Sequence, residues 1–191
     1  MSHRLITSPK QLFWKLEQEY EGKRILEIGC GNKKIKGAIG IDVRKNSLAD
    51  IHHDLNKFPW PIEDSQFDLV ICRHVLEHLP ETDKVMEEIY RIAKPSAKVA
   101  IEVPHFSYVE AYRHWQHCHF FTAGSFDYFH PDNKVYKCRF EIERKRVFFS
   151  DFFSKAFGIE FFANGFTRFY ERHLAFIFPA CVIYFDLRTI K

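Results

Sequence analysis

The sequence predicts an α/β fold in which a mostly parallel sheet lies between two layers of helices. Short apolar segments at residues 24–29, 38–43, 67–72 and 98–103 have the length of buried strands. The third of them, FDLVIC, is continuously apolar, as expected for a strand that is covered on both faces. Helical segments precede the first and the fourth of these strands, and this order favours parallel strands in a three-layer α/β/α sandwich.

Capping residues and apolar spacing define the helices of this half. Residues 8–21 begin with Ser8 as N-cap and Pro9 at the first helical position, and their apolar side chains share one face. Residues 81–93 show the same periodicity, and Pro95 ends it.

The C-terminal part shows two alternating strands with two helical pieces between them. The strands are predicted at 137–143 and 181–189, where apolar side chains recur at every second position. The spacing of phenylalanines predicts helices over 148–157 and 166–177. No repeat, linker or low-complexity segment divides the chain, so we expect residues 1–191 to form one domain.

Phenylalanine is the unusual feature of the composition. The chain has 191 residues and 21 phenylalanines, 12 of which lie between Phe148 and Phe185. The longest stretch there without charge or histidine, 174–185, has 12 residues, whereas a membrane-spanning helix needs about 20. We therefore expect no transmembrane segment, and the N-terminal residues lack the apolar core of a signal peptide. The helical spacing predicts that these rings cover one face of the sheet; a homodimer contact or a peripheral membrane contact is the alternative.

Charge and cysteine content restrict the partners and the compartment. The net charge of +3 is weak evidence for nucleic acid, so we do not expect a nucleic-acid partner. The five cysteines are scattered, odd in number and without a C-x-x-C pair. Free thiols of this kind indicate a reducing compartment and hence a cytoplasmic protein.

A glycine-rich loop, Glu27-Ile28-Gly29-Cys30-Gly31-Asn32, follows the first strand. Glycine allows a ligand to approach the backbone closely. Asp42, at the end of the next strand, suits the two hydroxyls of a ribose, because a carboxylate accepts both hydrogen bonds. A dinucleotide fingerprint would need a third glycine where Lys34 stands, and a helix under a pyrophosphate. The pattern therefore indicates a cofactor that carries adenosine without a diphosphate.

From residue 24 to residue 103 the chain resembles the class I S-adenosylmethionine-dependent methyltransferases, in particular the small type 11 group. Five motifs carry the resemblance, in the family's order: ILEIGCGN (25–32), GID (40–42), HDLNKFPWP (53–61), FDLVICRHVLEHLP (67–80) and MEEIYRIAKPSAKVAIEVP (86–104). The resemblance implies a Rossmann-like fold, a seven-stranded sheet with an antiparallel C-terminal strand, and S-adenosyl-L-methionine as the cofactor.

The resemblance also implies roles for individual residues. Asp42 would hold the ribose hydroxyls, and Asp54 would reach the adenine amino group with Leu55 beside the ring. Glu27 would anchor the glycine loop, and the ends of the strands at 24–29 and 67–72 would face the methionine part. The positions assigned to the cofactor in this way are Glu27, Gly29, Cys30, Gly31, Asn32, Asp42, Asp54, Leu55, Arg73 and His74.

One departure from the family concerns the first crossover. Only eight residues, Cys30 to Gly37, separate the glycine loop from the second strand, whereas a parallel crossover normally takes about a dozen or more. We predict that the crossover helix is reduced to a turn or that the second strand is displaced. Either arrangement exposes the cofactor edge beside Asn32.

Methyl transfer requires an aligned acceptor, and a hydroxyl acceptor also requires a base. His105, just past the strand predicted at 98–103, is our candidate base, because strand ends bind ligands in open α/β sheets. A packing role for this ring has equal support.

The aromatic segment 105–130 is predicted to bind the acceptor. Tyr108, Tyr112 and Trp115 would form its wall, and His119 matches a histidine that related enzymes carry before a Phe-Thr pair. The alternative is a lid that packs on the sheet.

Histidine and cysteine at 114, 117, 118 and 119 invite a metal hypothesis, since both residues bind zinc. Their spacing on a helix would point the side chains in different directions, so we assign no metal site to this segment.

The sequence therefore predicts methyl transfer to a small-molecule, saccharide or lipid-linked acceptor. Methylation of RNA or protein, a non-catalytic cofactor-binding scaffold and a metal-binding module are the alternatives.

Overall fold

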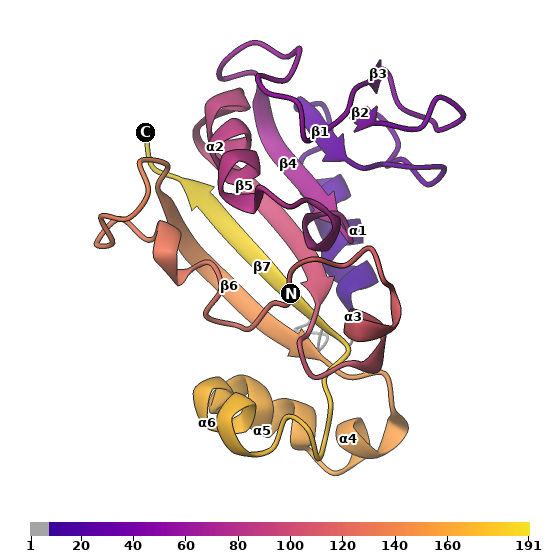
Figure 1. Cartoon of the computed structure of the whole chain (residues 1–191), viewed down its shortest axis with the longest axis vertical. Coiled ribbons are helices and arrows are strands. Elements are labelled where there is room, and N and C mark those ends of the chain that lie inside the picture. Colours follow the sequence, from indigo (N-terminus) through magenta and orange to yellow (C-terminus); the bar gives the residue numbers. More distant parts are fainter. Residues whose placement is uncertain (1–7) are drawn as a thin grey trace.

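A computed structural model describes residues 8–191, apart from the side chains of Phe152 and Phe153. One seven-stranded sheet, in the order β3-β2-β1-β4-β5-β7-β6, crosses the molecule (Figure 1). The strands are β1 (Ile25–Ile28), β2 (Ile39–Asp42), β3 (Ile51–His52), β4 (Phe67–Arg73), β5 (Ala93–Pro104), β6 (Phe140–Phe148) and β7 (Val182–Thr189). The longer helices are α1 (Pro9–Glu19), α2 (Thr82–Ile92), α5 (Ile159–Gly165) and α6 (Thr167–His173), and the short ones are α3 (Val109–Arg113), α4 (Phe152–Ala156), η1 (Leu76–His78) and η2 (Asp127–Phe129).

Strand directions follow the prediction. The first five strands pair in parallel, and β7 runs antiparallel to both β5 and β6. The mostly parallel sheet with an antiparallel C-terminal strand is therefore confirmed.

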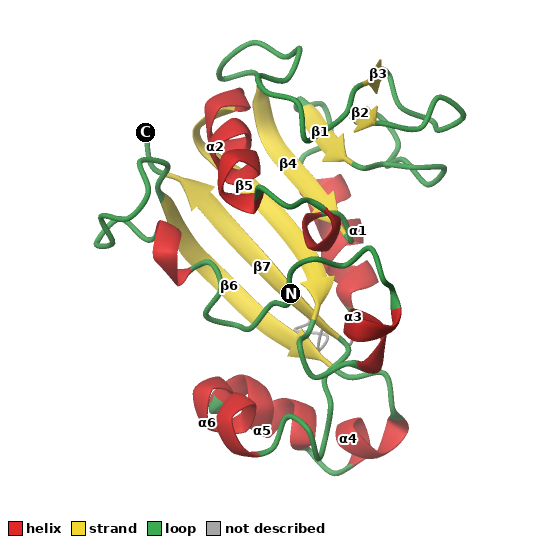
Figure 2. Cartoon of the chain, viewed as in Figure 1, coloured by secondary structure: helices red, strands yellow, loops and turns green. Residues whose placement is uncertain are grey.

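The helices α1 and α2 cover opposite faces of the sheet (Figure 2). Successive residues of β4 point to opposite faces: Leu69 and Ile71 pack with α1, whereas Val70 and Cys72 pack with α2. All four are fully buried, which explains why the FDLVIC segment is continuously apolar.

The crossover between β1 and β2 contains no helix, so the shortened connection is confirmed as a turn. A buried carboxylate takes the place of a helix in organising this turn. Glu27 Oε2 accepts a hydrogen bond of 2.6 Å from the backbone N–H of Ile35, and the neighbouring Ala38 N–H donates to Ile35 O. The chain can therefore enter β2 beside β1 without a full crossover.

Side chains of α2 hold the segment between β3 and β4 in place through hydrogen bonds to its backbone. Glu88 accepts the backbone N–H of Trp60 at 2.7 Å, and Arg91 donates to the carbonyls of Trp60 and Ile62. The Trp60 indole is buried and donates to the carbonyl of Leu55 at 3.1 Å. These bonds hold the loop that carries Asp54 and Leu55 next to the ends of β1 and β2.

The predicted helix bounds in the C-terminal part were wrong. Phe148 belongs to β6, where it pairs with Val182, and it therefore does not begin a helix. Three short helices, α4, α5 and α6, follow and gather beside the end of β6 (Figure 1).

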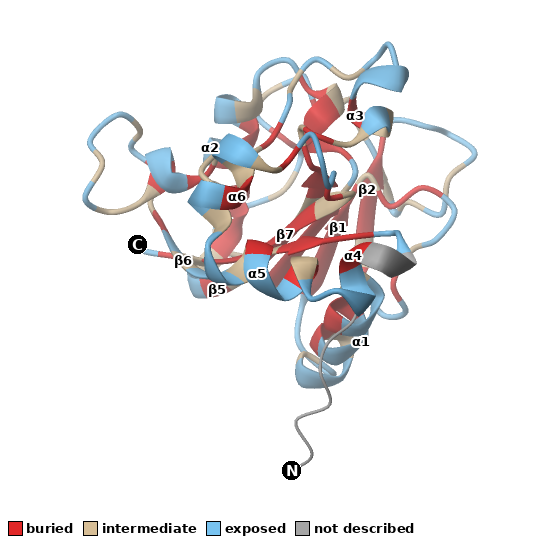
Figure 3. Cartoon of the chain, turned by 90° about the horizontal axis from the view of Figure 1, so that it is seen from below, coloured by how far each residue is buried: buried red, intermediate tan, exposed pale blue. Residues whose placement is uncertain are grey.

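The predicted cover of the sheet by aromatic rings was also only partly right. Tyr170 is buried in the core, but much of α5 and α6 is exposed to solvent (Figure 3). The exposed apolar side chains of these helices and the following residues include Phe161, Phe166, Phe169, Phe176 and Ile177. Among residues 8–191, no helix has the length and apolarity needed to cross a bilayer.

Candidate active site

A cavity of about 720 Å³ opens where β1, β2 and β4 end. The carboxyl ends of parallel strands are where open α/β sheets bind ligands, and the size is typical of a small-molecule site. Its lining residues are Gly29, Asp42, Val43, Arg44, Asp54, Leu55, Asn56, His74, Val75, His78, Leu79, His114 and Gln116.

The glycine loop reaches this cavity at Gly29. Gly29 and Gly31 have φ values of 63° and 55°, a region that other residues rarely adopt. A Cβ atom on Gly29 would lie 2.3 Å from Cγ2 of Val75, so no side chain fits there. The backbone of the loop is therefore bare toward the cavity, as a bound cofactor requires.

Asp42 lies at the end of β2 and lines the cavity with a largely buried carboxylate. Its Oδ2 accepts the N–H of Gly31 at 2.9 Å, and its Oδ1 accepts the N–H of Arg44 at 2.8 Å. Burial raises the pKa of this carboxyl, but the hydrogen bonds from Arg44 and Gly31 outweigh it and lower the pKa overall. An ionised acceptor therefore stands at the position predicted for the ribose.

Glu27 and Arg73 lie behind the loop rather than in the cavity. The two side chains form an ion pair, and Glu27 also accepts the N–H of Ile35. Cys30 is buried and Asn32 is exposed, and neither lines the cavity. Gly31 does not line the cavity either, so five of the ten residues predicted for the cofactor lie in or behind the loop without lining the cavity.

A smaller cavity of about 180 Å³ adjoins the first. His74, His78 and His114 line both, so these three side chains form the wall between them. The other lining residues are Glu77, Pro104, Tyr108, Glu110, His117, Cys181 and Val182. The second cavity therefore lies at the ends of β4 and β5, beside the larger one.

His74 follows β4 with a left-handed φ of 53°, which is unusual for a residue with a side chain. Its ring contacts two carboxylates: Nε2 lies 2.8 Å from Glu102 Oε1 and Nδ1 lies 3.4 Å from Glu77 Oε1. Burial opposes the charged form, but the hydrogen bonds to Glu102 and Glu77 outweigh it and raise the pKa of His74 to about 9. The ring is therefore an imidazolium at neutral pH.

Glu77 has one oxygen without a partner. Its side chain is almost fully buried, and Oε2 makes no hydrogen bond with any described residue. An unpaired buried carboxylate oxygen is costly, which makes this atom a place where a ligand donor would be stabilised.

The residues predicted for the acceptor do not stay together. Tyr108 lines the smaller cavity, whereas Tyr112 stacks on Phe120 at 4.6 Å between ring centroids. Trp115 is 92% exposed, and Nε2 of His119 lies 3.1 Å from the carbonyl of Pro80. None of these last three lines either cavity.

His105, our candidate base, is fully buried. Its Nδ1 bonds to Ser107 Oγ at 2.7 Å, its Nε2 lies 3.3 Å from Glu171 Oε1, and it lines neither cavity. This placement favours the packing role, in which the ring connects the segment after β5 to α6.

Four residues to which the sequence assigns no role complete the site: Glu77, His78, His114 and His117. Glu77 and His78 stand in the VLEHL phrase that carried the family resemblance, so that phrase held the missing signal. The sequence groups His114 and His117 only with Cys118 and His119 as possible metal ligands. The structure brings them to His78, which comes from a different element.

The raised pKa of His74 predicts a pH-dependent stability. The free imidazole titrates near 6.5 and His74 near 9, so the imidazolium contributes fully below pH 6.5 and its contribution is lost as the pH rises to about 9. We expect the Tm difference between wild type and His74→Gln to narrow over this range, by about 2–4 °C for each kcal/mol lost. Calorimetry at four pH values between 6.5 and 9 measures this Tm difference.

The control for this experiment is His52→Gln, which removes an exposed histidine of β3. Its Tm difference from wild type should not narrow between pH 6.5 and pH 9. A difference for His74→Gln that is constant over the same range would contradict the ion pairs with Glu77 and Glu102.

Comparison with known proteins agrees with this geometry. Residues 1–133 match the family of methyltransferase domains. Ubiquinone biosynthesis O-methyltransferase of Bordetella bronchiseptica is 30% identical over a region that covers 48% of this chain and 48% of that protein. The enzyme of the same name from Bordetella avium is 28% identical with the same coverage. The chain thus spans about half the length of the curated relatives it matches.

Solved structures show the same fold. A SAM-dependent methyltransferase from Archaeoglobus fulgidus superposes with a TM-score of 0.58 at 17% identity, over 95% of each chain. Phosphoethanolamine N-methyltransferase 2 of Haemonchus contortus, in complex with S-adenosyl-L-methionine, gives 0.55 at 18% identity over all of this chain and 55% of that one. The chain therefore belongs to the family of methyltransferase domains, and it has the fold of S-adenosylmethionine-dependent methyltransferases.

Proposed function

We propose that the protein methylates a hydroxyl of a small lipid-linked acceptor, with S-adenosylmethionine in the larger cavity and the acceptor in the smaller one. The observation that carries this proposal is the pair of adjoining cavities with a shared wall. A methyl donor and its acceptor must be held in contact and aligned, which two cavities that meet at His74 and His78 allow.

The larger cavity fits the cofactor. The bare backbone at Gly29 suits the methionine part, the ionised Asp42 suits the ribose, and Asp54 with Leu55 suits the adenine. When bound, the cofactor supplies a methyl group on a sulfonium, which is already activated. The Arg44 side chain, which lies across Asp42 and is more than half exposed, would give way to the ribose hydroxyls.

In the smaller cavity Glu77 is the proposed base. The acceptor hydroxyl would donate its hydrogen bond to Oε2, and its proton would pass to this carboxylate. The oxygen would form the new bond to the methyl carbon as the bond between that carbon and the sulfonium breaks, so the demethylated cofactor would leave as a neutral thioether. His74 contacts the other oxygen, Oε1, and so holds the carboxylate in place. Base catalysis of this kind contributes about 10²–10⁴-fold.

The acceptor class rests on the exposed aromatic side chains of α5, α6 and the following residues, which we call the aromatic surface (Phe161, Phe166, Phe169, Phe176 and Ile177). After this surface the chain returns through Cys181 and Val182, which line the smaller cavity. An apolar carrier on the aromatic surface would therefore place its head group at the site. The relatives named for ubiquinone biosynthesis agree with a small hydroxyl acceptor on an apolar carrier.

Charges around the aromatic surface favour a membrane over a second copy of the chain. Lys155, Arg168 and Arg172 are exposed, whereas Glu160 and Glu171 are turned inward. Exposed aromatic rings bordered by basic side chains suit an anionic lipid surface. We therefore propose peripheral contact with such a surface, and a homodimer is the competing occupant.

RNA or protein as the acceptor has less support, because the net charge of +3 offers no extended basic surface. A non-catalytic scaffold has less support as well, since it would not need an unpaired buried carboxylate at Glu77. All five cysteines are free, which fits the cytoplasm as the compartment of the reaction.

Asp42 tests the cofactor site. We expect S-adenosylmethionine to raise the Tm of the wild-type protein and Asp42→Asn to lose that shift, because the amide cannot accept both ribose hydrogen bonds. Thermal denaturation with and without the cofactor measures it.

Asp50→Asn is the matched control, because Asp50 also accepts a backbone N–H beside β2, from Gly40, yet lines neither cavity. It should keep the shift. An undiminished shift in Asp42→Asn would show that the ribose lies elsewhere.

A substitution of Glu77 tests its proposed role as the base in methyl transfer. With methyl-labelled cofactor and fractionated lipid, glycan and RNA extracts, we expect label in the lipid fraction and a loss of about 10²-fold or more in Glu77→Gln. Retention of the cofactor-induced Tm shift shows that this variant is folded, and Glu81→Gln, an exposed carboxylate of the same region, is the control. Label confined to RNA, or full turnover in Glu77→Gln, would overturn the proposal.

Vesicle binding tests the aromatic surface. We expect the protein to sediment with phosphatidylglycerol vesicles, and Phe161→Ser with Phe176→Ser to weaken binding by about tenfold or more, because each ring loses apolar burial. Leu48→Ser with Val135→Ser removes two exposed apolar side chains elsewhere and is the control. A dimer in solution that the Phe161 and Phe176 changes dissociate would assign the surface to a second copy instead.

A further inference from the structure

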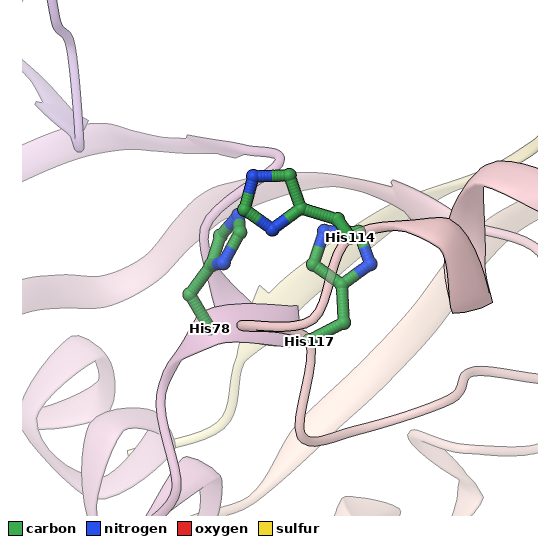
Figure 4. A group of neighbouring side chains, drawn as sticks. All are labelled: His78, His114 and His117. Carbon is green, nitrogen blue, oxygen red and sulfur yellow. The ribbon is translucent and has the colours of Figure 1, made fainter.

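Three histidines from two separate parts of the chain meet in the wall of the smaller cavity. His78 ends η1 after β4, whereas His114 and His117 follow α3. Figure 4 shows the three rings gathered around a common space. One ring nitrogen from each lies within 4.8 Å of the others, and the ring centroids are 4.6–5.2 Å apart.

Hydrogen bonds leave nitrogen lone pairs for a ligand. Nδ1 of His117 lies 3.0 Å from the carbonyl of Ala111, so it is the nitrogen that donates, and Nε2 is left as an acceptor. A backbone hydrogen bond at one ring nitrogen is the usual way in which a metal-binding histidine is oriented.

We propose that His78, His114 and His117 bind a divalent metal ion of the zinc class. The nitrogens of a tetrahedral zinc site lie about 3.4 Å apart, given a Zn–N distance of about 2.1 Å, so small rotations of the half-buried and exposed rings close the site. Three imidazoles without a thiolate or carboxylate favour zinc or cobalt over magnesium or calcium.

The neighbouring candidates for a fourth ligand point elsewhere. Cys118 Sγ contacts the carbonyl of Glu77 at 3.4 Å, and His119 Nε2 lies near the carbonyl of Pro80. Three protein ligands leave the fourth position open, as in catalytic zinc sites.

The proposed metal site lies where a bound acceptor could reach the open coordination position of the ion. His78 and His114 line both cavities, and His117 lines the smaller one. If the proposed O-methylation holds, an acceptor oxygen bound to the ion would stand between the cavities. The ion would lower the pKa of that hydroxyl, whose proton then passes to Glu77.

Metal binding is tested on the purified full chain, freed of its affinity tag and treated with a chelator, without cofactor or acceptor. Cobalt(II) titration followed by visible absorption should give one ion per chain with the spectrum of a tetrahedral nitrogen site, and zinc should displace it. His114→Gln and His117→Gln should each weaken cobalt binding by about 100-fold or more. Loss of a hydrogen-bond partner of a metal ligand already costs about 10–100-fold in affinity, and these variants remove a ligand itself.

His119→Gln is the matched control, because it removes a histidine of the same segment that lies outside the cluster. It should bind cobalt as the wild type does. Absence of stoichiometric binding, or binding that survives both His114→Gln and His117→Gln, would overturn the site. The failure of methyl transfer with intact cobalt binding would instead count against the proposed function.

Discussion

The buried carboxylate of Glu27 joins the elements that form the cofactor cavity. It stands on β1, accepts the N–H of Ile35 in the turn that replaces the crossover helix, and pairs with Arg73 at the end of β4. A buried charged group is costly unless it is paired and hydrogen-bonded, so these contacts stabilise Glu27 in its buried position. They bring the glycine loop, the start of β2 and the end of β4 to one place, and the cavity exists because those three ends meet.

The smaller cavity is organised differently, because not all of the polar groups around it have hydrogen-bond partners. His74 is held as an imidazolium between Glu77 and Glu102, in a backbone conformation that few residues adopt. Glu77 keeps one unpaired oxygen, and three imidazoles lie close together with lone pairs available. Strain and unpaired polar groups lower stability, and they collect here in one small region beside the cofactor cavity.

The C-terminal part connects this region to the surface. Glu171 of α6 accepts the N–H of Ala123 and contacts His105, so the helices of the aromatic surface are attached to the segment that closes the smaller cavity. The same helices turn acidic side chains inward and leave basic and aromatic ones outside. The aromatic surface and the segment beside the smaller cavity are therefore connected through Glu171.

The sequence by itself determined the central strands, the glycine loop and the acid at the end of β2, because these depend on local pattern. It did not predict the short strand β3, and β6 begins and ends later than the strand predicted at 137–143. Apolar runs make buried strands, a left-handed turn needs glycine, and a short spacing leaves no room for a helix. Only the tertiary structure decided which histidines meet. His78 joins His114 and His117 because β4 and the segment after β5 end at the same edge. The tertiary structure also decided that His105 is buried and that the aromatic surface is exposed. The spacing of apolar residues in the sequence does not reveal which element, if any, covers them.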